Sequence, residues 1–598
     1  MAAAARTLTE LLFGALDRFG SRPVVMRAKR DGAWIELSYR DLADRIQDLS
    51  LGLLELGIGA GDRVAILSEN HPEWAIADYA CLTACCTDVP IYPTLPARQV
   101  EHNLADSGAA AVFVSTLPQL EKVLAARPRL PSLRHIIAFD RQVQGPGVLD
   151  LEEVYARGRA ARPARANWRA DALRVRPEDL ATLIYTSGTT GEMKGVMLSH
   201  GNITSNVTTC CTLFSFTEHD ECLSFLPLSH IFERMFGHYC MLHSGVVINY
   251  AESIDTVAAD MQKWRPMLMA SVPRLYEKIY GRVLDAVGAG SAIKRRLFFW
   301  GKRVGESAVE RRLAGRALPP ALAAQLWVAD RLVFAKLRAR TGGRIRFFIS
   351  GGAPLSADIA KFFHAAGMPI LEGYGLTETS PVMAVNTFKH QRLGTVGLPI
   401  PGVEVRIAPD GEIITRGPNV MAGYYNKPQA TAEALDAEGW FHTGDIGQLD
   451  ADGFLRITDR KKDIIVTAGG KNISPQPIET LARTSKFVSN AVMLGDRRPF
   501  PIMLVVPDFE ALAAWAAQEG IPTTEAAELV RRPEVKAKVE GEVRTVLRDL
   551  AKFEMPKKLL LLPRDFSLDA DELTPKLSVK RRVVEQRHRA AIEALYAE

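Results

Sequence analysis

The chain has 598 residues, of which 47% are hydrophobic and 24% charged, and its formal net charge is +5. A chain of this length is too long for one hydrophobic core, so we expect at least two domains. The ordinary composition argues against a fibrous or disordered protein, and a charge this small for the size argues against binding of nucleic acid.

Cysteine usage indicates a reducing compartment. The seven cysteines include the adjacent pairs Cys85-Cys86 and Cys210-Cys211, and no C-x-x-C spacing suggests zinc. We therefore expect free thiols. No long apolar leader segment precedes Arg18, and no run of about 18 apolar residues occurs. The sequence thus predicts a cytoplasmic protein without a membrane-spanning helix.

Helix and strand signals alternate along the chain. Residues 8–12 open an amphipathic helix, residues 34–39 alternate like a strand, and residues 38–41 can start the helix whose apolar residues recur from 42 to 56. A turn and a buried strand are predicted over 57–67, and more strands at 89–92, 110–114 and 345–349. This alternation favours a doubly wound α/β architecture. In the last 140 residues we expect strands at 464–466, 491–494 and 502–506 and helices at 509–519 and 533–550.

A run of small residues follows the strand that ends at 183–185. Residues 185–195 read YTSGTTGEMKG. Glycines allow close backbone approach to a ligand, and successive N–H groups in such a turn form an anion-binding concavity. The pattern is not a P-loop, because Lys194 stands three residues after Gly191 and is followed by glycine. A Gly/Ser/Thr run alone is usually a simple loop. The candidate phosphate-binding residues are Thr186, Ser187, Gly188, Thr189, Thr190, Gly191 and Lys194.

Further motifs follow in a fixed order: VMLSHGN (196–202), LPLSH (226–230), GGAPL (351–355), GYGLTET (373–379), WFHTGD (440–445) and DRKKD (459–463). Together they resemble the motifs of the AMP-forming acyl-CoA synthetases of the adenylate-forming superfamily, and the chain looks most like the long-chain fatty acyl-CoA synthetases. The resemblance implies an N-terminal domain over 1–459, made of doubly wound sheets and a small β-barrel-like part. A small, mobile α+β domain over 460–598 would cap it. The implied reaction uses ATP and Mg²⁺ to convert a fatty acid to acyl-AMP, and then passes the acyl group to coenzyme A.

The same resemblance gives roles to individual residues. A carboxylate beside a phosphate needs a cation between them, so Glu378 is expected to bind Mg²⁺, together with Thr186. Asp445 would accept hydrogen bonds from the ribose diol, and His230 would lie near the acyl carboxylate and the phosphates. Outside its motif, each of these residues would more often be structural or solvated. The other implied residues are Gly351, Gly352, Ala353, Gly373, Tyr374, Gly375, Thr377 and Arg460 for the nucleotide, and Gly469, Gly470 and Lys471 for the pantetheine arm of coenzyme A.

The sequence departs from the family pattern at Ser578. The family usually carries a lysine there, which bridges the acyl carboxylate and the α-phosphate. Lys576 and Lys580 flank this position and, in an extended segment, share its face at a displacement of roughly 6.5–7 Å. Three interpretations stay open. Lys576 or Lys580 replaces the missing lysine, or adenylation relies on His230, Lys194 and Mg²⁺ with another basic group, or the chain is a weakly active or non-catalytic relative.

A basic, apolar stretch over residues 281–343 is predicted to be a helical insertion. Its lysines and arginines fit the solvated face of helices packed on the core, which is the simpler interpretation. Alternatively, residues 291–340 lie on an anionic membrane as a basic amphipathic segment, which would place the protein at the inner membrane surface.

Two other functions compete with the synthetase. A fatty acyl-AMP ligase that loads a carrier protein often has an insertion that blocks the CoA step. No extra segment is obvious between residues 355 and 460, which favours coenzyme A as the acceptor. A non-catalytic protein that binds fatty acid or nucleotide is supported by Ser578 and opposed by the intact Lys194, Glu378 and Asp445.

Overall fold

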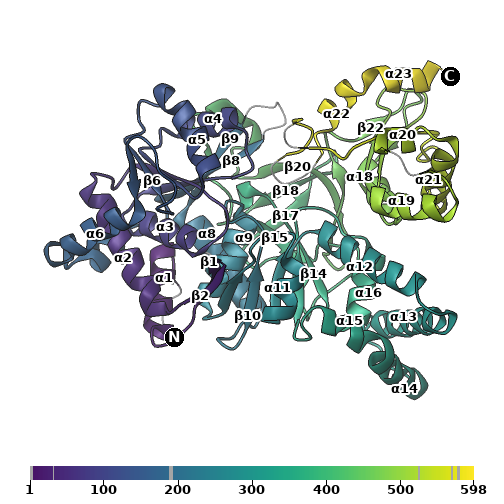
Figure 1. The fold of residues 1–598 in the computed structure, drawn as a ribbon, viewed down its shortest axis with the longest axis horizontal. Helices are drawn as coiled ribbons and strands as arrows, with labels where there is room; N and C mark the ends of the chain where they lie inside the picture. Colours follow the sequence, from purple (N-terminus) through teal and green to yellow (C-terminus); the bar gives the residue numbers. More distant parts are fainter. Residues whose placement is uncertain are drawn as a thin grey trace.

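The structure is a computed structural model that describes residues 5–30, 32–187, 193–522, 525–567, 570–574 and 579–597. Two large sheets form the N-terminal part, and the C-terminal part lies beside them with its own small sheet and helices (Figure 1). None of the described helices is both long and apolar enough to span a membrane. The predicted α/β fold with a smaller C-terminal part is confirmed.

The nine-stranded sheet has the order β16-β15-β14-β13-β12-β10-β11-β1-β2. Its central strands run parallel, and antiparallel strands close both edges. The strands are β1 (Met26–Arg30), β2 (Ala33–Leu37), β10 (Glu221–Ser224), β11 (Val247–Tyr250), β12 (Leu268–Ser271), β13 (Phe347–Ser350), β14 (Ile370–Gly375), β15 (Val382–Val385) and β16 (Leu398–Pro399).

The eight-stranded sheet has the order β19-β9-β8-β4-β3-β5-β6-β7, with parallel pairing from β8 to β7 and antiparallel pairing from β8 to β19. The strands are β3 (Arg63–Leu67), β4 (Thr87–Ile91), β5 (Ala111–Val114), β6 (His135–Ala138), β7 (Val148–Asp150), β8 (Leu180–Ser187), β9 (Met193–Ser199) and β19 (Gly423–Tyr424).

Helices cover both faces of each sheet, so the alternating helix and strand signals did indicate a doubly wound fold. One apolar core lies between the sheets: Ile66 of β3 and Cys222 of β10 face it, whereas their neighbours Leu67 and Leu223 face outer cores. The central helices are α1 (Leu8–Phe19), α2 (Tyr39–Glu55), α3 (Pro72–Thr83), α8 (His200–Leu213) and a helical run of α9 (Ile231–Glu233), 234–240 and α10 (Met241–His243). All 12 residues of α3 are buried, as expected of a helix enclosed on every side.

The outer helices complete the layers. Those outside the eight-stranded sheet are α4 (Ala97–Ser107) and α5 (Leu117–Ala126), while α6 (Leu151–Ala161) packs on α2 and α7 (Trp168–Ala172) follows it. Those outside the nine-stranded sheet are α11 (Val257–Trp264), α12 (Pro273–Gly288), α13 (Ala292–Leu313), α14 (Pro320–Ala329), α15 (Ala335–Arg340) and α16 (Ala357–Ala365). The predicted insertion is therefore helical, and α13 and α14 project from the body at the lower right (Figure 1).

The predicted barrel-like part is an antiparallel sheet, β17-β18-β20-β21, of β17 (Glu404–Ile407), β18 (Glu412–Arg416), β20 (Phe441–Leu449) and β21 (Leu455–Arg460), with α17 (Pro428–Ala434) alongside. The C-terminal strands are β22 (Ile465–Val466), β23 (Asn472–Ile473), β24 (Val488–Leu494), β25 (Ile502–Pro507) and β26 (Lys558–Leu561). The helices of the C-terminal part are α18 (Pro475–Ala482), α19 (Phe509–Gln518), α20 (Ala526–Leu529), α21 (Pro533–Val546), α22 (Arg581–Arg587) and α23 (Arg589–Ala597).

Three local predictions need correction. Tyr39 begins α2 instead of ending a strand, because Ser38 and Asp41 form a reciprocal capping box at that point. Thr186 and Ser187 belong to β8 and not to the small-residue turn, since their backbones continue the antiparallel ladder with β9. The helix that begins at Pro533 ends at Val546, four residues earlier than expected.

Candidate active site

The predicted phosphate segment connects two strands of one hairpin. β8 ends at Ser187 and β9 begins at Met193, and Thr186 lies directly opposite Lys194 in the ladder. Thr186 and Lys194 are both half-buried. The predicted residues Gly188, Thr189, Thr190 and Gly191 lie outside the described residues. The antiparallel pairing therefore places Lys194 directly across from Thr186, where the predicted phosphate segment begins.

Lys194 and Glu378 are joined through a tyrosine that no motif singled out. The Lys194 ammonium lies 4.8 Å from the ring centre of Tyr424, within the range of a cation–π contact. The Tyr424 hydroxyl donates a hydrogen bond to Glu378 Oε1 at 3.0 Å. Two residues predicted to contact the nucleotide and its metal, 184 positions apart in the chain, thus share one neighbour.

The turn that carries Glu378 is held from several sides. Thr377 is buried, and the Leu376 N–H donates to Thr379 Oγ1 at 2.9 Å. A Cβ at Gly375 would lie 1.7 Å from the Pro381 carbonyl oxygen, so this position requires glycine. Gly373 pairs with Val385 in the same sheet. The turn is therefore a fixed platform for the half-buried Glu378 carboxylate.

Asp445 sits between two partners predicted to bind the nucleotide. Tyr374 donates its hydroxyl to Asp445 Oδ2 at 2.5 Å, and Arg460 Nε lies 3.3 Å from Oδ1. Burial raises the pKa of the Asp445 carboxyl, against the lowering effect of the Arg460 charge. These three residues come from β14, β20 and β21, so two sheets meet at this point.

His230 presents a defined tautomer. Its Nδ1 accepts a hydrogen bond from the Phe232 N–H at 3.0 Å, which places the proton of a neutral ring on Nε2 as a donor. Asn70 holds the preceding segment, because its Nδ2 donates to the Leu226 carbonyl and its Oδ1 accepts from the Leu228 N–H. The imidazole is thus oriented by the backbone of its own turn, and Asn70, from the loop after β3 of the eight-stranded sheet, holds the segment that precedes it.

A buried ion network fixes the helix that follows His230. Arg234 is fully buried, and its Nη2 lies 2.5 Å from Asp78 Oδ1 and 2.7 Å from Asp88 Oδ2. It also donates to Thr182 Oγ1 at 2.9 Å. The guanidinium therefore ties this helix to α3, β4 and β8.

The glycine segment after β13 lies close to the His230 turn. A Cβ at Gly351 would lie 3.3 Å from the Phe232 ring, and Gly352 adopts a φ of +82°, which favours glycine. Gly352 and Ala353 are exposed. Residues 352 and 353 are therefore accessible at the surface, and their contact with the adenine stays a prediction.

The predicted pantetheine segment forms the tip of the β22–β23 hairpin. Gly469, Gly470 and Lys471 are exposed, and Thr467 closes the tip through hydrogen bonds with the Gly470 and Lys471 N–H groups. The Lys471 ammonium lies 5.9 Å from the ring centre of Phe553. These neighbours all belong to the C-terminal part, so this structure does not join the tip to Lys194 or Glu378.

The described residues on either side of the segment expected to carry the family lysine are paired. Leu573 pairs with Val579, and the Lys580 N–H donates to the Glu572 carbonyl at 2.7 Å. Lys580 forms an ion pair of 2.5 Å with Asp571 beside this pairing. Lys576 and Ser578 lie outside the described residues.

The residues present suit Mg²⁺ only together with a nucleotide. Within the described ranges, no three His, Cys, Asp or Glu side chains converge as a ligand set. Mg²⁺ is commonly held by one or two carboxylates plus phosphate oxygens. Glu378 supplies one carboxylate, and Tyr424 leaves its second oxygen for another partner. A cation carried by a triphosphate fits this arrangement.

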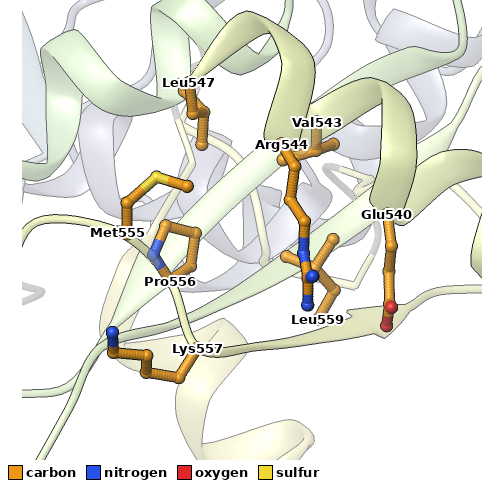
Figure 2. Close-up of a pocket in the computed structure, with 8 residues that line it drawn as sticks. All are labelled: Glu540, Val543, Arg544, Leu547, Met555, Pro556, Lys557 and Leu559. Atoms are coloured by element: carbon orange, nitrogen blue, oxygen red, sulfur yellow. The ribbon is translucent and has the colours of Figure 1, made fainter. Parts of the chain in front are cut away.

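Figure 2 shows a separate hollow on the C-terminal part, between α21 and β26. Val543, Leu547, Met555 and Leu559 form its apolar wall. Arg544 and Lys557 are also among the lining residues, and none of the lining residues was predicted to bind a ligand. The hollow does not contribute to the candidate site.

Comparison with known proteins identifies the family of this chain. A family model described as AMP-binding enzyme matches residues 13–425, and one described as AMP-binding enzyme C-terminal domain matches residues 462–598. The chain belongs to the family of AMP-binding enzymes. The predicted membership in the adenylate-forming enzymes is thereby confirmed.

Curated relatives of this AMP-binding enzyme extend over nearly the whole chain. It is 39% identical to the long-chain-fatty-acid–CoA ligase FadD15 of Mycobacterium bovis, over 96% of this chain and 94% of that protein. It is 34% identical to the peroxisomal long chain acyl-CoA synthetase 7 of Arabidopsis thaliana, over 96% of this chain and 83% of that protein.

Solved structures show the same fold at lower identity. The anthranilate CoA ligase AuaEII in complex with anthranoyl-AMP is 17% identical, with a TM-score of 0.73, and the match covers 99% of this chain and 98% of that one. ATP-bound MatB from Rhodopseudomonas palustris is 23% identical, with a TM-score of 0.67, over 97% and 99% of the two chains.

Sequence reasoning missed three residues that organise the site: Asn70, Arg234 and Tyr424. Asn70 and Tyr424 act on segments more than 40 positions away, and no local pattern marks such contacts. Arg234 follows the LPLSH motif by four residues, and a charged residue inside an apolar helical stretch was a signal that could have drawn attention to it.

Proposed function

We propose that this AMP-binding enzyme activates a long-chain fatty acid with ATP and transfers the acyl group to coenzyme A. The observation that carries the proposal is the meeting of Lys194 and Glu378 at Tyr424, in a chain similar over 96% of its length to long-chain-fatty-acid–CoA ligases. The charges of these residues fit a triphosphate and its cation, and the relatives indicate the acid.

The reaction has two steps. First, a carboxylate oxygen of the fatty acid attacks the α-phosphorus of ATP, and the bond to the bridging oxygen breaks to release pyrophosphate. Second, the thiolate sulfur of coenzyme A attacks the acyl carbonyl carbon, and AMP leaves with the bonding electrons. A carboxylate is already ionised at neutral pH, so the first step needs no general base. What the protein supplies is positioning and stabilisation of charge.

Each predicted residue then has a place in this scheme. Lys194, Thr186 and the predicted phosphate segment cradle the phosphates, and Glu378 would hold Mg²⁺, which would neutralise phosphate charge. Thr377 contacts a phosphate. Asp445 and Arg460 hold the ribose, while Tyr374, Gly373, Gly375 and the 351–353 segment lie against the adenine. His230 donates its Nε2–H to the acyl carboxylate or the α-phosphate, and residues 469–471 line the path of the pantetheine arm.

The division into residues 1–459 and 460–598 fits this two-step chemistry. Several contacts link the parts at the Asp459-Arg460 junction. Arg460 reaches back to Asp445, the Gln476 N–H donates to Asp459 Oδ2 at 3.4 Å, and the Lys461 ammonium pairs with Asp410 and Glu412. Rotation about this junction would bring residues 469–471 to the acyl-AMP for the second step.

The missing family lysine is best sought at Lys576. Lys580 is bound to Asp571, whereas Lys576 lies in sequence between the paired residues Leu573 and Val579. Adenylation that depends on Lys576 would be abolished in Lys576→Ala and nearly unaffected in Lys580→Ala. The reverse result would assign the role to Lys580.

The test of the proposed function is fatty-acid-dependent ATP–pyrophosphate exchange with palmitate, octanoate and acetate, followed by acyl-CoA formation with added coenzyme A. Exchange that is strongest with palmitate, and palmitoyl-CoA as product, would support the proposal. Exchange without any use of coenzyme A would favour a ligase that loads a carrier protein. Absence of exchange in the wild type, with recovery in Ser578→Lys, would favour a non-catalytic relative.

The helical insertion is further proposed to dock on an anionic membrane surface. Residues 291–340 hold 12 Lys and Arg but three Asp and Glu, while the whole chain has a net charge of +5. Exposed large apolar side chains gather there as well, and the Arg331 guanidinium lies 4.2 Å from the ring centre of Trp327. These exposed side chains are Ile293, Phe299, Leu313, Trp327 and Leu332. Basic and apolar groups on one projecting unit suit a lipid headgroup region.

Vesicle sedimentation tests this docking. The wild type should sediment with vesicles that contain phosphatidylglycerol, less so at high salt, and not with vesicles of phosphatidylcholine alone. The double variant Ile293→Ser/Trp327→Ala should lose most of this binding. Phe388→Ala removes an equally exposed aromatic side chain outside the insertion and should change nothing. Equal sedimentation with both lipid mixtures would contradict the proposal.

A further inference from the structure

Tyr424 contacts both charged residues on which the proposed nucleotide site depends. Its hydroxyl donates to Glu378 Oε1 at 3.0 Å, and its ring centre lies 4.8 Å from Lys194 Nζ. The hydroxyl edge of the phenol thus meets an anion, while the negative face of the ring meets a cation. The carboxylate therefore faces the hydroxyl hydrogen, the ammonium faces the electron-rich ring, and Tyr424 itself is neutral.

Backbone hydrogen bonds hold Tyr424 from two directions. β19 pairs with β9, with Tyr424 opposite Val196, and the Tyr425 N–H donates to the Gly195 carbonyl at 2.8 Å. On the other side, the Met421 N–H donates to the Glu378 carbonyl at 2.8 Å. The segment over 421–425 therefore connects the strand of Lys194 to the turn of Glu378.

The phenol of Tyr424 is the donor in its hydrogen bond to the Glu378 carboxylate. A hydroxyl that keeps its proton fixes the rotation of the carboxylate that accepts from it, and leaves the second carboxylate oxygen for another partner.

We propose that Tyr424 is a positioning residue that keeps the Glu378 carboxylate turned toward a divalent cation and the Lys194 ammonium turned toward the phosphates of a bound nucleotide. The inference rests on the proposed function. An ammonium and a carboxylate on hydrogen-bonded neighbouring segments attract each other, and a direct ion pair would occupy both groups that the ligand needs. Tyr424 contacts both groups and keeps them from forming a direct ion pair with each other.

Two substitutions separate the two halves of this role. Tyr424→Phe keeps the ring under Lys194 and removes the hydroxyl, whereas Tyr424→Leu removes both. Tyr425→Phe is the matched control, because Tyr425 lies next in sequence and takes no part in these two contacts. ATP binding to each folded protein is measured by calorimetry over a series of Mg²⁺ concentrations, and the thermal midpoint of each variant is recorded.

The expected results differ in kind. Tyr424→Phe should raise the Mg²⁺ concentration that gives half-maximal ATP binding by about tenfold, the usual effect of losing a hydrogen bond to a charged group, and leave ATP binding without Mg²⁺ unchanged. Tyr424→Leu should also weaken ATP binding without Mg²⁺ by about two- to fivefold, since Lys194 loses its cation–π partner. Tyr425→Phe should behave as wild type in both measurements.

A wild-type Mg²⁺ dependence in Tyr424→Phe, at an unchanged thermal midpoint, would overturn the inference, as would equal shifts in Tyr424→Phe and Tyr425→Phe. A different result would contradict the proposed function and leave the test of Tyr424 intact. If the wild type binds ATP with Mg²⁺ but catalyses no exchange with any fatty acid, the synthetase proposal is wrong, and the Mg²⁺ titrations still decide the role of Tyr424.

Discussion

Glu233 is a buried acid whose protonation should make the stability of the protein depend on pH. It is 1% exposed, and its Oε1 accepts a hydrogen bond from Ser224 Oγ at 2.6 Å. Burial raises the pKa of Glu233 from 4.5 to about 8, and the Ser224 hydroxyl offsets only part of this effect. The folded protein therefore holds a proton here that the unfolded chain releases above about pH 4.5.

The sign and size of the effect follow from proton linkage. Because the folded state binds more protons between about pH 4.5 and pH 8, the contribution of Glu233 to stability falls as pH rises through this range. At 1.36 kcal/mol per pH unit, the loss between pH 5 and pH 8 is about 3 kcal/mol. Glu233→Gln cannot ionise and keeps an oxygen for Ser224, so it should escape this loss.

Urea unfolding at pH 5, 6, 7 and 8, followed by tryptophan fluorescence, measures the difference. The free energy of unfolding of Glu233→Gln should gain about 3 kcal/mol on the wild type from pH 5 to pH 8. Other buried acids are present in both proteins and cancel. The exposed Glu121→Gln is the control and should track the wild type. Parallel pH curves for wild type and Glu233→Gln would refute the reasoning, because they would mean that the folded protein ionises Glu233 at its ordinary pH.

Four further substitutions have expected outcomes. Gly375→Ala should destabilise the protein by about 1–3 kcal/mol or more, since its Cβ would lie 1.7 Å from the Pro381 carbonyl oxygen. Gly281→Ala, in open space on α12, should stabilise it slightly, and denaturant midpoints that are equal for the two variants would contradict this. Arg234→Met should cost about 3–5 kcal/mol in the same urea assay, because it leaves two buried aspartates without their cation; a loss below 1 kcal/mol would mean that solvent reaches the network. Asp445→Asn should raise the KM for ATP about tenfold with little change in the KM for palmitate, since a charged acceptor of the ribose diol is lost; equal changes in both would point to general damage.

Much of the candidate site was predictable because its motifs are local. The 185–195 segment and GYGLTET each place their polar residues within a few positions of a strand end, and the structure puts Lys194 and Glu378 at such places, whereas Asp445 lies in the middle of β20. The capping box at Ser38 and the helical spacing from Leu42 to Leu56 were likewise readable, since caps and i, i+3/i+4 contacts depend on neighbours in sequence.

The sequence by itself therefore determined the family, the α/β class and the residue types proposed to meet a nucleotide. Only the tertiary structure decided which of them share partners. Tyr424 reaches Glu378 because β19 pairs with β9 across more than 200 residues, and Arg234 meets Asp78 because α3 is enclosed between the sheets. Such contacts depend on packing of the whole core and on strand register, which no window of adjacent residues encodes.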